Sequence, residues 1–364
     1  MLKSSKLLRP CWRLAPTLKA NYDEFDYAYK RGEDGFCQFI DRPSQLPIEA
    51  TAIFLFPGQG AQFVGMGKNL LKYPGVKEMY ETASSILRTD LLKTCLEGPA
   101  DKLRNNIHCQ PAIYVTSLAA VKKIQHESPK MIENCVAAAG YSVGEIAALT
   151  FAGSFTFEEG LHLVRVRAEA MQKICEQIPG GMLSVRTTHE SRLYDCINAA
   201  RNACPLDLKT LAVCHCQIAA FLAPEVRVVS GTNQALEFIE NHYEQFRLKS
   251  VKRLDVEGPY HTVNMEPAMK AMIRAFGKME EPRNPKIPVL CNYDVKPYHF
   301  NVNPLLAISA KSIVYWEQIL HCLYSRPDTY PFPVTVEVGP GRQLGVTLRL
   351  VNRKAFQRYQ NVEV

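Results

Sequence analysis

Apolar residues follow two alternating patterns along the chain. Short continuous apolar runs, TAIFLF at 51–56 and NCVAAAG at 134–140, are followed by proline or glycine and predict buried parallel strands. Longer stretches place apolar residues every three or four positions, which predicts helices at about 67–72, 76–96, 110–126 and 158–177. This alternation predicts an α/β fold with a mostly parallel sheet.

The middle of the chain has a different pattern. Strand-like segments at 180–185, 227–232 and 248–256 alternate with helical segments at about 190–203 and 233–245. We expect a small α+β subdomain at 180–254, inserted into a core formed by 51–179 and 255–364. The polar, tyrosine-rich segment 23–50 is predicted to be a connector. Near the end, TVEVGPGRQLG at 335–345 predicts a late strand, a glycine turn and a final basic helix.

Composition limits the class of protein. The 364 residues are 47% hydrophobic, which is ample for a large core, and no apolar stretch approaches the roughly 18 residues that span a bilayer. Membrane insertion is not expected. The cysteines form no CxxC pair, and Cys214 and Cys216 lack a second pair at metal-ligand spacing, so we expect no metal site.

The net charge of +7 is concentrated at the N-terminus. Residues 1–22 carry five basic side chains and no acidic one, so the remainder is close to neutral and gives no indication of nucleic-acid binding. An acid-free basic leader with scattered leucines predicts a mitochondrial transit peptide, and hence a location in the mitochondrial matrix. A disordered basic tail is the alternative.

The segment AAGYSVGEIAAL at 138–149 contains a GxSxG motif at the junction of a predicted strand and a helix. Such an elbow holds its serine in a strained backbone conformation, with glycines where neighbouring chain packs too closely for a side chain. The helix N-terminus there favours developing negative charge. Ser142 is therefore predicted to be a nucleophile; a serine that only caps the helix is the alternative.

The segment FPGQGAQFVGMG at 56–67 places a glycine-rich turn directly after a strand. It has no GxxxxGK[ST] pattern, and Phe63 stands where a dinucleotide fingerprint needs its third glycine, so phosphate binding is disfavoured. We expect the backbone N–H of Gln59 to form an oxyanion hole with that of Val143. An ordinary tight turn is the alternative.

Two arginines lie on different faces of the predicted helix 158–177. Arg165 has Glu169 four residues later, which predicts a solvated ion pair. Arg167 has apolar neighbours at i−4, i+3 and i+4, the last being Met171, so its guanidinium projects from an apolar face and needs an anion. A bound carboxylate is the best match, and a carboxylate of the protein itself is the alternative.

His261 stands in GPYHTVNMEPA, on a Gly-Pro loop just before a helix. A lone histidine in this setting is usually structural. Beside an elbow serine, it is the obvious general base.

These segments, in this order, resemble the malonyl-CoA:acyl carrier protein transacylase family, and specifically its animal mitochondrial members. The likeness covers about 51–350. It rests on the GQGxQ turn, on GYSVGE for the family's GHSxGE, on Arg167 25 residues after the serine, on GPYHTVNMEPA and on EVGPGRQLG. It implies a hydrolase-like α/β core with a parallel sheet and an inserted ferredoxin-like subdomain, which agrees with the division made from the pattern of elements.

The resemblance also implies a reaction. Ser142, with His261 as base, takes the malonyl group of malonyl-CoA as an ester and passes it to the phosphopantetheine thiol of acyl carrier protein, feeding mitochondrial fatty acid synthesis. Exchange between a thioester and an oxyester is nearly isoenergetic, so no cofactor is implied. Arg167 holds the distal carboxylate. Met171 and Tyr260 are predicted to bind substrate, and the aromatic ring at 260 to exclude an α-methyl branch.

Some positions depart from the family pattern or carry a weaker assignment. Ala220 stands where the family commonly has an asparagine, so a hydrogen bond from the pocket wall is expected to be missing. A backbone carbonyl at Ser309 is expected to orient the histidine. Five basic residues without an acid between 342 and 358, and a second group at 249–253, predict a docking surface for the acidic carrier protein around Arg349, Arg353 and Lys252. A solvated helix face is the alternative.

Two other functions compete. A serine esterase or thioesterase needs a carboxylate to orient His261 and access for water, whereas an arginine in an apolar pocket favours a dicarboxylic acyl group. An inactive scaffold protein is disfavoured because Ser142, His261 and Arg167 are all present.

Overall fold

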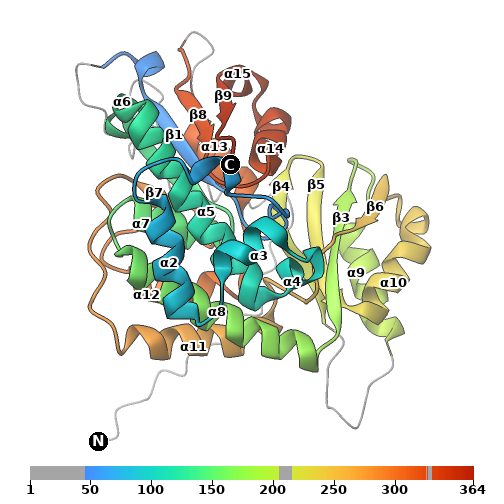
Figure 1. The fold of residues 1–364 in the computed structure, drawn as a ribbon. Helices are drawn as coiled ribbons and strands as arrows, with labels where there is room; N and C mark the ends of the chain where they lie inside the picture. The colour runs from blue at the N-terminus through green and yellow to red at the C-terminus, as the bar shows by residue number, and fades with distance from the viewer. Residues whose placement is uncertain (1–45, 205–214, 325, 327–329) are drawn as a thin grey trace, which may run out of the picture.

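The computed structural model describes residues 46–204, 215–324, 326 and 330–364. The predicted transit peptide at 1–22 and Cys214 lie outside these residues. Two sheets organise the fold, a parallel one in the core and an antiparallel one that projects to the side of it (Figure 1). In the part of the chain described, no helix has the length and apolar character that crossing a membrane would require.

The core is built on a five-stranded sheet in the order β7-β2-β1-β8-β9, in which every neighbouring pair is parallel. The strands are β1 (Ala52–Phe56), β2 (Cys135–Gly140), β7 (Val289–Leu290), β8 (Val334–Glu337) and β9 (Tyr359–Asn361). All residues of β1 and β2 are buried, as expected for continuous apolar runs in strands covered on both faces. The predicted α/β class is confirmed.

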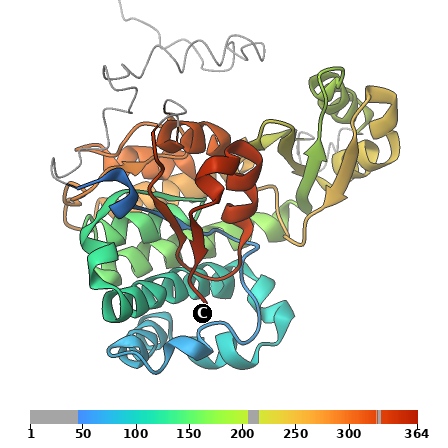
Figure 2. The ribbon, with the colours of Figure 1, turned by 90° about the horizontal axis from the view of Figure 1, so that it is seen from above.

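Helices surround this sheet (Figures 1 and 2). Those before the antiparallel sheet are α2 (Val76–Leu87), α3 (Leu91–Glu97), α4 (Ala100–Arg104), α5 (Asn106–Glu127), α6 (Pro129–Glu133), α7 (Gly144–Phe151) and α8 (Phe157–Gln177). Those after it are α11 (Glu266–Phe276), α12 (Val302–Ser309), α13 (Trp316–Tyr324), α14 (Gln343–Val351) and α15 (Arg353–Phe356). Short 3-10 turns are η2 (Ile48–Ala50), η3 (Lys68–Leu70) and η5 (Val263–Met265). Helix α7 packs on β1 and β2, and α5 packs on α8, which brings α8 to the elbow.

The inserted unit has the order β3-α9-β4-β5-α10-β6 and an antiparallel sheet in the order β4-β5-β3-β6. This βαββαβ arrangement is the expected ferredoxin-like one. Its elements are β3 (Gly180–Arg186), α9 (Leu193–Ala203), β4 (Cys216–Ala223), β5 (Val226–Thr232), α10 (Asn233–His242), η4 (Tyr243–Phe246) and β6 (Ser250–Arg253). It has its own cluster of buried apolar side chains beneath α9 and α10.

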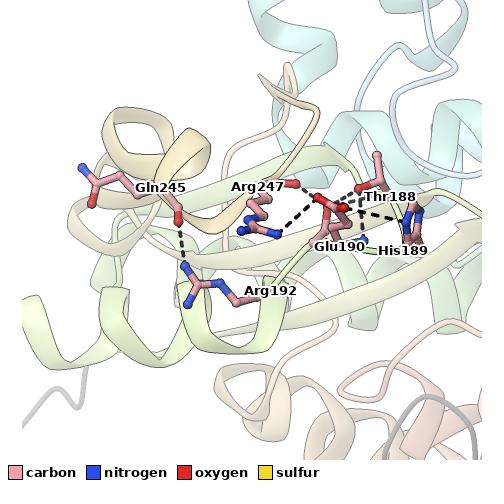
Figure 3. Close-up of polar contacts among 7 residues, drawn as sticks. Thr188, His189, Glu190, Arg192, Gln245 and Arg247 are labelled. Carbon is pink, nitrogen blue, oxygen red and sulfur yellow. Dashed lines mark hydrogen bonds and ion pairs between the residues drawn. The ribbon is translucent and has the colours of Figure 1, made fainter.

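Polar contacts close the outer end of this unit, where the turn after β3 meets the turn before β6 (Figure 3). Arg192 Nη2 donates to the carbonyl of Gln245 at 2.8 Å, and Arg247 Nη1 lies 3.3 Å from Glu190 Oε2. These side chains are exposed, so each contact contributes little on its own.

Backbone hydrogen bonds and a buried ion pair attach the inserted unit to the core. The N–H of Phe221 in β4 donates to the carbonyl of Val314 at 3.0 Å. The N–H of Val314 in turn donates to the carbonyl of Ala219 at 2.9 Å. Beside them, Arg227 Nη1 lies 3.2 Å from Glu317 Oε2, with both side chains almost fully buried. The inserted unit is thereby held at a fixed position beside the core.

The elements differ from the predicted ones at several places. The helix expected at 67–72 is only the 3-10 turn η3, and strands β7 and β9 were not predicted. The helix expected at 76–96 is two helices, because Arg88 adopts φ 54° and Asp90 caps the next helix through the N–H of Lys93. Strand β4 was also not predicted.

Candidate active site

Ser142 lies in the tight turn between β2 and α7, with φ 54°. A Cβ on Gly140 would lie 2.0 Å from the carbonyl of Gly144, and a Cβ on Gly144 would lie 2.3 Å from the carbonyl oxygen of Phe56. Both glycines of the motif are therefore required by close backbone packing, as the elbow interpretation expects. The turn places the hydroxyl of Ser142 in the wall of a cavity.

Asn292, two residues after β7, holds the elbow from outside. Its Oδ1 accepts the N–H of Ser142 at 2.8 Å, and its Nδ2 donates to the carbonyl of Gly140 at 2.6 Å. Because the N–H of Ser142 is engaged in this way, the next N–H along the turn, that of Val143, is the elbow donor left for an oxyanion.

His261 contacts the nucleophile directly. Its Nε2 lies 2.8 Å from Ser142 Oγ, and its Nδ1 lies 3.0 Å from the carbonyl oxygen of Ser312. Since a carbonyl can only accept, the Nδ1 position carries the proton and Nε2 is free to accept the hydroxyl proton. The orienting hydrogen bond goes to Ser312, three residues beyond the predicted Ser309, because α12 ends at Ser309 and the following turn brings the later carbonyl to Nδ1.

Burial controls the protonation of this histidine. Desolvation and, second to it, the nearby charge of Arg167 lower the pKa of His261 to about 4, against the carbonyls of Ser312 and Ser309, which raise it. The Ser309 carbonyl thus has a secondary influence. The imidazole is neutral at pH 7 and is able to act as a base.

Arg167 extends from α8 to the same serine. Its Nη2 donates to Ser142 Oγ at 2.9 Å, and its Nη1 donates to Gln110 Oε1 at 2.6 Å. The side chain is buried, and no carboxylate of the described residues lies within 4.0 Å of its guanidinium. Desolvation accordingly lowers the pKa of Arg167 to about 10, with Glu145 the first of the groups that raise it. By contrast, Arg165 lies 3.9 Å from Glu169, as predicted for an ion pair.

A buried carboxylate, Glu145, lies behind the elbow. It accepts hydrogen bonds from the backbone N–H of Asn292 at 2.7 Å, from the hydroxyl of Tyr298 at 2.7 Å and from the hydroxyl of Ser309 at 2.6 Å. Burial raises the pKa of Glu145 to about 7, against these hydrogen bonds and Arg167, which lower it. Glu145 therefore ties β7, α12 and the elbow into one network.

Gln59 and Val143 supply two backbone N–H groups near the serine. Gln59 follows β1, and Val143 stands at the start of α7. Within the described residues, neither N–H donates to another group of the protein. Both are free to meet an oxygen that carries negative charge.

The cavity in front of Ser142 has a volume of about 330 Å³. Met171 and Tyr260, the two residues predicted to bind substrate, line it together with Arg167 and His261. The Tyr260 hydroxyl lies within hydrogen-bonding distance of two acceptors, Asn106 Oδ1 at 2.9 Å and the carbonyl of Glu257, so its ring is fixed. The inserted unit contributes an apolar wall made by Met182, Leu222, Val228 and Leu254, which Val256, just after the unit, extends.

Ala220 does not line this cavity. It is fully buried in β4, where it forms a bridge with Val314, and Leu222 two residues later is the β4 residue in the wall. Its methyl group belongs to the large buried apolar cluster that also contains Met182 and Val228. The expectation that a hydrogen bond is missing at this position stays a prediction.

The residues of the predicted docking surface are exposed, and they lie on or near segments that contribute to the cavity lining. Arg349 and Arg353 lie on α14 and α15, and α14 also contributes Leu344 and Thr347 to the cavity lining. Lys252 lies in β6, two residues before Leu254.

Sequence reasoning missed several residues that shape the site, chiefly Asn292, Gln110, Glu145 and Ser312. Glu145 stood within the quoted GYSVGE segment, and a carboxylate among apolar helix positions is a signal of a buried partner. Gln110 follows the same logic on a long apolar helix. Asn292 gives no local signal, because its partners lie 150 positions earlier.

Comparison with known proteins agrees with this geometry. The sequence model of the acyl transferase domain family matches residues 53–299. The chain is 44% identical over 316 residues to the human protein named malonyl-CoA-acyl carrier protein transacylase, mitochondrial, covering 86% of this chain and 80% of that one. It is 42% identical over 323 residues to a Drosophila melanogaster protein named as the probable mitochondrial enzyme of this kind, covering 88% and 84%.

A solved structure gives the same result. The acyl-carrier-protein-S-malonyltransferase of Bartonella henselae superimposes with a TM-score of 0.76 at 26% identity, covering 86% of this chain and 96% of that one. With the serine elbow, the histidine and the buried arginine in one cavity, the chain belongs to the malonyl-CoA:acyl carrier protein transacylase family.

Proposed function

We propose that this protein transfers the malonyl group of malonyl-CoA to the phosphopantetheine thiol of acyl carrier protein through an ester on Ser142. The observation that carries the proposal is the guanidinium of Arg167, which is buried without a carboxylate partner and lies 2.9 Å from the nucleophile. A malonyl group places a carboxylate within reach of that guanidinium when its thioester carbonyl stands at Ser142 Oγ.

The first half-reaction acylates the enzyme. His261 Nε2 takes the proton of Ser142 as Oγ attacks the thioester carbonyl, and the oxyanion is held by the N–H groups of Gln59 and Val143. The carbon–sulfur bond then breaks, His261 returns the proton to the departing CoA thiolate, and the malonyl-serine ester remains.

The second half-reaction reverses these steps with another thiol. The phosphopantetheine thiol gives its proton to His261 and attacks the ester carbonyl, and the same two N–H groups hold the second oxyanion. The bond to Ser142 Oγ breaks, His261 protonates that oxygen, and malonyl-acyl carrier protein leaves. We propose that the inserted unit, residues 180–254, is a separate subdomain. Its apolar wall is the surface along which the pantetheine arm lies.

The protein acts in the mitochondrion, since its human and fly relatives are named as mitochondrial enzymes. We place it in the matrix, where its product would feed fatty acid synthesis, because the acid-free basic leader has the composition of a transit peptide.

One assay tests the proposal. The protein is incubated with radiolabelled malonyl-CoA, first alone and then with the matching carrier protein. We expect label on Ser142 that persists without carrier protein and moves to it when it is added. Rapid release of free malonate would instead identify a hydrolase, and no labelling at all would support the inactive scaffold.

We further propose that carrier protein docks on Arg349, Arg353 and Lys252. Carrier proteins are acidic, and these three side chains are exposed beside elements that line the cavity. Neither Arg349 nor Arg353 forms an ion pair with the described residues, although Arg349 lies over the ring of Phe356. Nearby, Arg253 is paired with Glu240, so its charge is already balanced.

Reversing both charges, Arg349→Glu with Arg353→Glu, should raise the KM for carrier protein by about tenfold or more at low salt, because two attractive contacts become repulsive. The effect should shrink as salt is added. Acylation of Ser142 by malonyl-CoA, measured by the label, should be unaffected. Lys130→Glu, on α6, serves as the control for a change of net charge, and an unchanged KM for the double variant at low ionic strength would remove this docking surface.

Tyr260 is proposed to exclude acyl groups with an α-methyl branch, because its ring lines the cavity and its hydroxyl is fixed by Asn106 and Glu257. Tyr260→Ser should raise the ratio of methylmalonyl to malonyl transfer by about tenfold, since it vacates the volume of the ring. The ratio of the two kcat/KM values measures this. A ratio equal to that of the wild type would show that another residue excludes the branch.

A further inference from the structure

The loop after β1 carries Gln59, and its tip at Gly60 is held by polar contacts rather than by packing. Gly60 is exposed with φ 101°, and a Cβ built on it would have no neighbour within 4 Å. Its N–H donates to Gln62 Oε1 at 2.8 Å, and its carbonyl accepts from Gln343 Nε2 at 3.0 Å. Two side-chain amides therefore hold the backbone on both sides of Gly60.

The other neighbour of Gln59 is held in a different way. A Cβ on Gly58 would lie 2.4 Å from the carbonyl oxygen of Tyr141, so the loop is packed directly on the elbow at that point. Gln59 thus stands between a residue fixed by packing and a residue fixed by hydrogen bonds. The direction of the Gln59 N–H depends on the positions of both neighbours. Of the two amides that hold Gly60, that of Gln62 belongs to the same loop, whereas that of Gln343 ties the loop to a distant element.

Gln343 is itself well placed to hold the loop. It is the first residue of α14, and Glu337 at the end of β8 accepts the N–H groups of Leu344 at 3.1 Å and Gly345 at 2.8 Å. The Tyr359 hydroxyl donates to the same carboxylate at 2.6 Å. The start of α14 is thereby anchored to the central sheet, 283 positions from the loop that it contacts.

We propose that Gln343 is a positioning residue for the oxyanion hole: its amide holds the carbonyl of Gly60 so that the N–H of Gln59 points at the oxygen that becomes negative. This inference rests on the proposed function. Gln343 also lines the cavity in front of Ser142, but its amide N–H is engaged by the Gly60 carbonyl at 3.0 Å. In this proposal Gln343 acts through the loop, so its contribution is made only when charge develops in the transition state.

The test replaces Gln343 by methionine, which keeps the length of the side chain and removes the N–H donor. We expect the rate constants of both half-reactions to fall by about tenfold, or about 1.4 kcal/mol, because one loosely held donor weakens both oxyanions. The KM for malonyl-CoA should stay within about twofold, as expected when only transition-state binding is lost. Rapid-quench labelling of Ser142 and transfer to carrier protein measure the two steps.

Gln357→Met, an exposed glutamine after α15, is the matched control and should behave as the wild type. Unchanged rate constants for Gln343→Met would overturn the inference, and so would a raised KM with unchanged rates, which would make Gln343 a substrate contact. Thermal melting shows whether Gln343→Met has lost its folded structure. If it has, Gln343→Glu is tested instead, because glutamate keeps the shape of the side chain and also lacks the N–H donor. Wild-type rate constants in Gln343→Glu would count against the inference. Wild-type protein without transfer activity would instead refute the proposed function.

Discussion

Arg167→Ala should lower malonyl transfer by about a hundredfold or more while raising the acceptance of acetyl-CoA. The guanidinium is buried, donates to Ser142 Oγ at 2.9 Å and to Gln110 Oε1 at 2.6 Å, and is paired with no carboxylate among the described residues. Truncating one partner of a desolvated charge pair costs about 2–5 kcal/mol, and that loss applies only to an acyl group with a carboxylate. Transfer of a neutral acyl group becomes faster, because its binding no longer leaves a buried cation without an anionic partner.

The measurement is the ratio of kcat/KM for malonyl-CoA to that for acetyl-CoA. Arg165→Ala is a matched control on the same helix. Arg165 is only partly buried, and its guanidinium donates a hydrogen bond to the carbonyl of Ile86, which does not line the cavity. If Arg167→Ala reduced malonyl and acetyl transfer equally, Arg167 would hold the site together rather than select the substrate.

His261→Ala should slow acylation of Ser142 by about a thousandfold, in the range expected when a general base is removed. The wild-type enzyme should also show a distinctive pH profile. Because the pKa of His261 is lowered to about 4, the base remains neutral as pH falls from 7 to 5, and kcat/KM should decline only when the pH approaches 4.

Labelling of Ser142 by malonyl-CoA at several pH values measures both effects. The control His189→Ala removes a histidine that is exposed at the outer end of the inserted unit (Figure 3). Adding Ser142→Cys to His261→Ala should recover part of the labelling, since a thiol needs less help from a base. Normal acylation in His261→Ala would exclude the proposed pair.

The sequence predicted the parts of the site that depend on local pattern. Strands β1 and β2 follow from continuous apolar runs, and the elbow between β2 and α7 follows from two glycines around Ser142. Arg167 was identified because helical spacing puts it on an apolar face. In each case, the prediction depends only on residues that lie close to one another in the sequence.

What the sequence did not predict depends on contacts between distant segments. Asn292 and Gln343 hold the elbow and the oxyanion loop from far along the chain, and neither position has a local pattern that points to its partner. The carbonyl beside His261 belongs to Ser312 and not to Ser309, because the way a helix ends decides which carbonyl faces outward. The place of Ala220 depended on β4, a strand whose pairing is not visible in its residues.

The distribution of these supports along the chain has a consequence for when the enzyme first becomes active. Ser142 receives its backbone support from Asn292, its base from His261 and the carbonyl behind that base from Ser312, all of them more than 100 positions later. A chain that is still being synthesised, or that is held unfolded during import into the organelle, therefore carries Ser142 as an ordinary unactivated serine. Chemical competence arises only when the C-terminal third has folded onto the rest, so a copy that is not yet folded has no means of consuming malonyl-CoA.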